Sequence, residues 1–145
     1  MQRKLGLMAT SATSLLLKGK DVVIYSKCLP IEHPSIFKDV TRGKTALYVC
    51  MSEEHLDKVG FKIATIMAYA EPSSITILTM DGSPHCTQLH TIAEQARRIT
   101  GIDAKIVHLV VEKGALVEIS SQAVYLSRHL SKIDALLRDY AKKSL

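Results

Sequence analysis

Tryptophan is absent from this sequence, and aromatic residues make up only 5% of its 145 residues. Proteins that bind single-stranded nucleic acid stack the bases on exposed aromatic rings, so this composition argues against that class. The net charge of +5 would suit a polyanionic partner. Lysine and arginine are nevertheless scattered along the chain and form no basic arm or stripe. We therefore expect no nucleic-acid partner.

Cysteine is also scarce, and long apolar runs are missing. Cys28, Cys50 and Cys86 are an odd number without the close spacing of a disulfide scaffold, so we expect reduced thiols and a cytoplasmic protein. No stretch approaches the ~18 consecutive apolar residues of a membrane span. The moderately apolar stretch 5–17 is interrupted by threonine and serine and lacks the cleavage site of a signal peptide. We predict a helix there that ends at Gly19.

What is present is an ordinary globular composition, with 47% apolar and 23% charged residues. A chain of this length typically forms one hydrophobic core, so we predict a single domain over residues 1–145. Short β-branched runs then alternate with longer helical periods from residue 21 onward. Predicted buried strands cover residues 21–26, 45–51, 74–80 and 104–111. A fifth strand over 115–119 either pairs antiparallel with the fourth or extends the sheet in another way.

Serine, proline and glycine mark the boundaries of two predicted helices between these strands. Ser52 is expected to cap one helix, which Pro72 ends. Ser83 caps the next, with Pro84 at its first position, where the missing N–H costs nothing. Gly101 is expected to end that helix. The alternation predicts a three-layer α/β domain with a mainly parallel sheet of four or five strands and helices on both faces, of the flavodoxin/Rossmann-like type.

The closing segment, residues 122–142, is predicted to be one helix. Apolar residues recur in it at spacings of three and four, at Ala123, Leu126, Leu130, Ile133, Leu137 and Tyr140. A stripe of under three heptads typically faces the core of its own domain, which is our prediction. The alternative is that this helix pairs with a second copy in a homo-oligomer. His129 is expected on the solvent side of the helix, and His108, inside the fourth strand, is expected to be packed and hydrogen-bonded.

The three cysteines follow three of the predicted strands. Cys28 comes just after the first, Cys50 lies near the end of the second, and Cys86 comes six residues past the third. Parallel α/β sheets bind ligands beyond the carboxyl ends of their strands, so neighbouring strands would bring the three thiols to one cleft. The predicted working edge comprises residues 27–34, 50–55 and 81–90.

The segment DGSPHCTQLH places Cys86 in the first turn of a helix. Unpaired backbone N–H groups and the helix dipole stabilise a thiolate there. His90 lies four residues later on nearly the same helix face, and either it or His85 could act as the acid or base partner. We predict thiol chemistry, redox or sulfur transfer, on a small molecule or a protein thiol. Cys28 or Cys50 would be the resolving thiol.

A metal site is the first alternative. Cys28, Cys50 and Cys86, with His90 or His85 as a fourth ligand, form a set that zinc accepts, and three thiolates could also hold an iron–sulfur cluster. The sequence contains no C-x-x-C pair to support this reading. On this hypothesis the cofactor is either zinc or an iron–sulfur cluster.

A non-catalytic ligand-binding or interaction module is the second alternative. Gly82 and Ser83, at a helix start, could cradle an anion, and His55 could overhang the same edge. With Cys28 and Cys50 they are the predicted ligand-binding residues. No glycine-rich nucleotide motif accompanies them. The sequence leaves open whether the protein is an enzyme.

Overall fold

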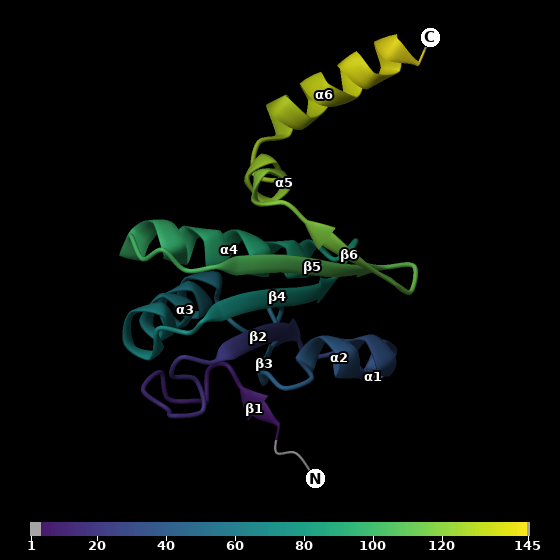
Figure 1. The fold of residues 1–145 in the computed structure, drawn as a ribbon. Coiled ribbons are helices and arrows are strands. Elements are labelled where there is room, and N and C mark those ends of the chain that lie inside the picture. Colours follow the sequence, from purple (N-terminus) through teal and green to yellow (C-terminus); the bar gives the residue numbers. More distant parts are fainter. Residues whose placement is uncertain (1–3, 145) are drawn as a thin grey trace.

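The computed structural model describes residues 4–144, which fold around one six-stranded sheet (Figure 1). Its strands are β1 (Leu5–Gly6), β2 (Asp21–Ser26), β3 (Thr45–Val49), β4 (Ser74–Met80), β5 (Ile106–Glu112) and β6 (Ala115–Ile119). They lie in the order β1-β3-β2-β4-β5-β6. All neighbouring pairs are parallel except β5 and β6. The predicted α/β class with a mainly parallel sheet is confirmed, and the two-residue β1 brings the strand number to six.

Helices cover both faces of the sheet. They are α1 (Leu29–Glu32), α2 (Pro34–Thr41), α3 (Leu56–Ala70), α4 (Pro84–Thr100), α5 (Ser121–Leu126) and α6 (Leu130–Lys143). On one face, α3 and α4 bury Ile63 and Leu89 against Ile24 and Leu47 of the sheet. On the other face, α1 and α2 pack over β2 and β3, where the rings of Tyr25 and Phe37 lie 4.6 Å apart. The three predicted layers are therefore present.

The predicted start of the helix after β4 is confirmed in detail. The side chain of Ser83 accepts a hydrogen bond from the backbone N–H of Cys86, and Pro84 is the first residue of α4. Gly101 ends the helix with a φ of 69°, a conformation that glycine adopts without strain. The helix expected from Ser52 begins later, at Leu56, because the N–H groups of residues 53 and 54 bond the carbonyl of Cys50 in a turn.

The helix predicted over residues 5–17 is wrong. Leu5 and Gly6 form β1 beside β3, and a series of turns follows. The hydroxyl of Thr10 donates to the carbonyl of Gly6 at 2.7 Å, and Ser14 accepts the N–H of Leu16. Serine and threonine side chains offer the backbone local partners that compete with helical hydrogen bonds. The frequent hydroxyls in this stretch therefore outweigh its apolar content.

The single closing helix with a core-facing stripe is also wrong. The helix is interrupted after α5, where the Ser127 hydroxyl donates to the carbonyl of Val124 at 2.6 Å. Helix α6 starts only at Leu130. His129 directly precedes α6 instead of lying mid-helix. Val124 is buried in α5, whereas α6 has no buried residue. Within residues 4–144, no helix combines the length and apolar character needed to cross a membrane.

Candidate functional site

The sheet contains one point where the strand order reverses. From β2 the chain adds β3 on one side and then β4 on the other, so the carboxyl ends of β2 and β4 flank the reversal. Connections leave such ends in opposite directions and open a crevice, which is where doubly wound sheets bind ligands. Ser26 ends β2 on one side of this switch point. Asp81 and Gly82 lead from β4 into α4 on the other.

Cys86 and Ser26 meet across the switch point. The Cys86 Sγ atom lies 3.2 Å from the Ser26 Oγ atom, and Cys86 is half-buried in the first turn of α4. When the sulfur is a thiolate, the serine hydroxyl donates to it. The aligned peptide dipoles of α4 favour the same negative charge. The sequence placed Cys86 at a helix start but could not supply Ser26, because strand order decides this contact.

The other two cysteines lie at the same carboxyl edge. Cys28 is exposed just after β2, and the Sγ atom of the half-buried Cys50 lies 2.9 Å from the Ser52 Oγ atom. Although Cys28 is exposed as a residue, partial burial of its thiol raises the pKa, and the charges of Cys86 and Cys50 raise it further. The three sulfur atoms are therefore close enough to interact electrostatically. Their charges would repel one another if all three were ionised.

The remaining predicted site residues lie around this edge, and most of them are exposed. His85 is exposed in the first turn of α4, next to Cys86. Gly82 has a φ of 85° in the turn between β4 and α4, and Ser83 is occupied by its cap to Cys86. His55 is exposed and directly precedes α3, at the edge where β3 ends. These residues border the switch point and bring no further hydrogen bond to Cys86.

His90 is turned to a different set of partners. Its Nε2 atom lies 2.7 Å from the Thr79 hydroxyl, and its Nδ1 atom lies 2.9 Å from Nδ1 of His108. The ring is buried, so desolvation and the neighbouring His108 lower the pKa of His90 to about 3. Both ring nitrogens are thus engaged away from Cys86. The prediction that His108 is packed and hydrogen-bonded is confirmed, because its side chain is 1% exposed.

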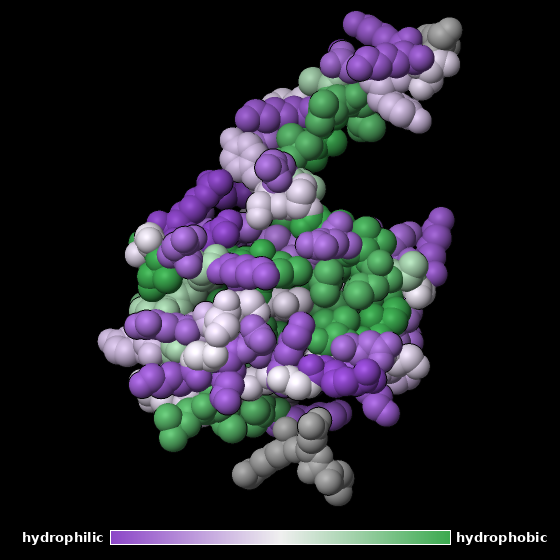
Figure 2. Space-filling view, viewed as in Figure 1, coloured by the Kyte–Doolittle hydropathy of each residue, from purple (hydrophilic) through white to green (hydrophobic). Residues whose placement is uncertain are grey.

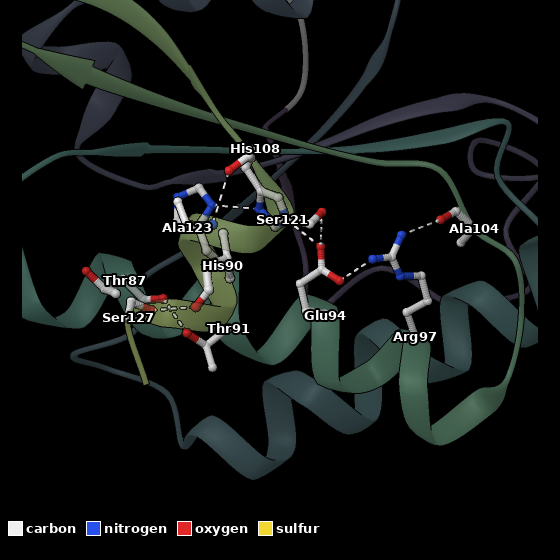
Figure 3. Close-up of polar contacts among 12 residues, drawn as sticks. Thr87, His90, Thr91, Glu94, Arg97, Ala104, His108, Ser121, Ala123 and Ser127 are labelled. Carbon is white, nitrogen blue, oxygen red and sulfur yellow. Dashed lines mark hydrogen bonds and ion pairs between the residues drawn. The ribbon is translucent and has the colours of Figure 1, made fainter. Parts of the chain in front are cut away.

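Glu94 completes this cluster, which we call the histidine network: Thr79, His90, Glu94, Arg97, His108 and Ser121. Figure 3 labels its members from His90 to Ser121. The Glu94 carboxylate accepts the Nε2–H of His108 at 2.7 Å and the hydroxyl of Ser121 at 3.0 Å, and pairs with Arg97. Burial alone would raise the pKa of Glu94, but these hydrogen bonds and the Arg97 charge lower it overall. Sequence reasoning missed Glu94. The available signal was its position four residues after His90 on the same helix.

The network has one arrangement of protons when both histidines are neutral. Ionised Glu94 accepts Nε2–H of His108, whose Nδ1 must then accept Nδ1–H of His90. The free Nε2 of His90 in turn accepts the Thr79 hydroxyl. Every buried polar side-chain atom among residues 4–144 has a partner. The network consequently ties α4 to β4, β5 and the start of α5.

A comparison with protein families matches residues 14–143 to a family described as a Rossmann-like domain. The chain belongs to this Rossmann-like domain family. Comparisons with curated proteins and with solved structures give no match. Membership agrees with the doubly wound sheet and its switch point, while the activity of this Rossmann-like domain must be argued from its own side chains.

The Rossmann-like domain also contains a cavity of about 200 Å³ beside the histidine network. Its lining includes Thr79, Asp81 and His90 together with Val110 and Val124. It opens beyond the carboxyl ends of β4 and β5, adjacent to the switch point. The polar groups of Thr79 and His90 already satisfy each other, so a ligand here would meet mainly apolar walls and the carboxylate of Asp81.

The thiols of this Rossmann-like domain do not form a ready set of metal ligands. Throughout residues 4–144, no group of three or more histidine, cysteine, aspartate or glutamate side chains is placed to hold one ion. His90, the predicted fourth ligand, bonds Thr79 and His108 instead. The thiols share an edge without converging on one point.

Proposed function

We propose that this Rossmann-like domain performs thiol–disulfide exchange at its switch point, with Cys86 as the nucleophile and Cys28 as the resolving thiol. The observation that carries the proposal is the 3.2 Å contact between Cys86 Sγ and Ser26 Oγ. It fixes a half-buried sulfur at a helix start, at the position where doubly wound sheets bind their ligands.

The two thiols differ in ways that suit these two roles. Cys86 has a hydroxyl donor and the positive end of the α4 dipole beside it, both of which stabilise a thiolate. The pKa of Cys28 is raised, first by burial and then by the charge of Cys86, so a negative charge at Cys86 disfavours a second one at Cys28. Once Cys86 enters a disulfide its charge is gone, and Cys28 ionises more easily. The order of attack follows from this coupling.

The exchange proceeds in two balanced steps. The Cys86 thiolate attacks one sulfur of a partner disulfide, whose S–S bond breaks, and the second sulfur leaves as a thiolate that takes a proton from water. The Cys28 thiolate then attacks the Cys86 sulfur of the mixed disulfide. A Cys28–Cys86 disulfide forms and the partner's remaining thiolate leaves. The domain loses two electrons and the partner disulfide gains them.

The charges at the edge favour an uncharged reactive group over a phosphate or another strong anion. Lys27, which precedes Cys28, pairs with Glu53 at 3.4 Å and lies over the Tyr48 ring. Glu54 borders the same edge beside Cys50. The charge of Lys27 is thus balanced by nearby carboxylates, which suits a protein or small-molecule disulfide.

The test is oxidation of the reduced protein with oxidised glutathione, followed by peptide mass spectrometry. The expected product in the wild type is a Cys28–Cys86 disulfide, and Cys28→Ser should trap glutathione on Cys86. Cys86→Ser should abolish the disulfide, whereas Cys50→Ser should retain it. Glutathione trapped on Cys28 in Cys86→Ser as fast as on Cys86 in Cys28→Ser would refute the assigned roles.

Elemental analysis of protein purified without oxygen or chelator separates this proposal from metal binding. Thiol exchange predicts less than about one zinc or iron atom per ten chains. One metal or one cluster per chain, lost in both Cys28→Ser and Cys86→Ser, would make these residues ligands and overturn the exchange mechanism.

A further inference from the structure

Helix α6 has an apolar side that the chain itself leaves uncovered. Leu130, Ile133, Leu137 and Tyr140 fall on one side of the helix, with charged residues on the other, and Figure 2 shows the apolar side chains gathered there. Leu130 is 79% exposed, Leu137 61% and Tyr140 73%. A helix of 14 residues is marginal in water unless its apolar face packs against something. Within residues 4–144, nothing covers the apolar side of α6.

The sheet has a matching uncovered face. On the side of α1 and α2, Leu78 of β4 and Val111 of β5 are buried in one cluster with Leu29 and Val40 of these helices, whereas no helix of residues 4–144 lies over the rest of β5 or over β6 (Figure 1). Register places the half-buried Leu109 and Met80 on this face together with Leu116 of β6, which is 44% exposed. Figure 2 shows the apolar surface over β4 and β5, between β6 and α2. We call it the open face. Parallel strands are normally covered on both faces, so one helix is missing here.

We propose that a second copy of this chain supplies the missing helix, with α6 of each protomer lying on the open face of the other. Each chain carries one unpartnered helix and one face that lacks a helix, so a two-fold exchange covers both surfaces in both copies. Such an exchange is self-complementary and closes at two protomers.

The connection to α6 favours the second copy over the chain's own open face. Helix α5 packs against α4, and its Ala123 and Val124 line the cavity beside His90, on the opposite face of the sheet. Only residues 127–129 link α5 to α6, and three residues span at most about 10 Å. This link is too short to carry α6 around the edge strand β6 to the open face of the same chain. Figure 1 shows α6 leading away from the body.

The size and charge of the contact suit a stable dimer. A helix about 21 Å long and about 10 Å wide covers roughly 200 Å² of sheet, or about twice that in accessible area on each surface. Two such contacts bury roughly 1,600 Å², the size of a standard stable interface. Register also puts the exposed Glu118 on the open face beside Leu109. Lys132 and Lys143 flank the apolar side of α6 and supply the opposite charge.

Sedimentation equilibrium of the full chain over a concentration series tests the proposal. The wild type should be a dimer. Leu137→Glu in α6 and Leu116→Lys on the open face should each raise the dimer dissociation constant by more than about tenfold. Ser131→Glu, on the polar side of α6, adds a similar charge and should leave the dimer intact. Circular dichroism checks that each variant is folded, which is expected because Leu116 and Leu137 lie outside the buried core.

Two results would overturn the proposal. A wild type that stays monomeric at all concentrations would show that α6 does not pair with a second copy. A dimer that Leu137→Glu dissociates but Leu116→Lys does not would show that the helices pair with each other, away from the open face.

Discussion

The hydroxyl of Ser26 and the thiol of Cys86 lie 3.2 Å apart, although sixty residues separate them in the chain. The contact joins the end of β2 to the first turn of α4, across the switch point of the sheet. It gives Cys86 a hydroxyl partner from a distant strand in the first turn of a helix, whereas the hydroxyl beside Cys50 belongs to Ser52, only two residues away. The first prediction tests that difference directly.

Replacing Ser26 with alanine should slow alkylation of Cys86 at pH 7 by about two- to tenfold, because the thiolate loses a hydrogen-bond donor. The rate is measured with iodoacetamide and peptide mass spectrometry. Ser52→Ala is the matched control, since it removes the hydroxyl 2.9 Å from Cys50 Sγ. The control should alter the Cys50 rate alone. An unchanged Cys86 rate in Ser26→Ala would show that the contact has no influence on the thiolate.

The free energy of unfolding should fall as the pH drops from about 6 toward 3. The lowered pKa of His90 should account for part of this loss. The unfolded chain protonates this histidine near pH 6.5, whereas the folded protein keeps it neutral down to about 3. The unfolded state therefore binds more protons in that window, and acid favours it by up to about 1.4 kcal/mol per pH unit. Above pH 7 this contribution is constant.

His90→Gln isolates that contribution, because an amide can still bond Thr79 and His108 but does not titrate. Urea unfolding at pH 7, 6, 5 and 4 should give a shallower loss of stability for the variant than for the wild type. The lowered pKa of Glu94 adds acid sensitivity to both proteins and cancels in the comparison. Parallel pH profiles would contradict the assignment of the slope to His90.

Glu94→Leu should destabilise the fold by about 2–4 kcal/mol, since it leaves the buried Nε2–H of His108 without an acceptor. Glu94→Gln should cost less, because its amide oxygen can still accept that hydrogen bond. Gln88→Leu, an exposed position on the same helix, should change stability by no more than about 0.5 kcal/mol. Chemical denaturation measures all three. Equal losses at positions 94 and 88 would mean that the histidine network adds nothing to stability.

Gly60 of α3 packs against Ile92 of α4, where a Cβ atom on residue 60 would lie 2.6 Å from Cγ1 of Ile92. Overpacking costs about 1–3 kcal/mol, and the helix propensity of alanine returns about 1 kcal/mol. Gly60→Ala should therefore be destabilising by roughly 1 kcal/mol. In an Ile92→Ala background the clash is gone, and the same substitution should become stabilising. A cost that is independent of Ile92 would place the strain elsewhere.

Local signals account for the parts of the fold that were predicted correctly. The strands at residues 21–26, 74–80 and 115–119 have the predicted bounds. The start of α4 follows from Ser83 and Pro84, which act within one turn of the backbone. Prediction failed over residues 5–17 and 122–142, where apolar spacing suggested continuous helices. Hydroxyl groups such as those of Thr10 and Ser127 bond nearby carbonyls there, and hydrophobic periodicity carries no information about that competition.

The sequence predicted the three cysteines of the candidate site, but it predicted neither their contacts nor the presence of Ser26 and Glu94. The order of residues along the chain placed Cys28, Cys50 and Cys86 at strand ends, and the structure gathers them at one edge. The expected pairing of Cys86 with His90 was reasonable from their spacing on α4. The structure instead pairs His90 with His108, because the packing of α4 against β4 and β5 turns this ring into the interior.

The sequence by itself determined the α/β class, the positions of the main strands, the placement of the cysteines after them and the apolar side of α6. These properties depend on residues a few positions apart, whose backbone preferences and periodicity act locally. Only the tertiary structure decided that Ser26 is the partner of Cys86, that Glu94 accepts the hydrogen bond of His108, and that α6 and the open face are both left uncovered. Those outcomes depend on strand order, register and a helix break, which bring distant segments together and are set by the packing of the whole chain.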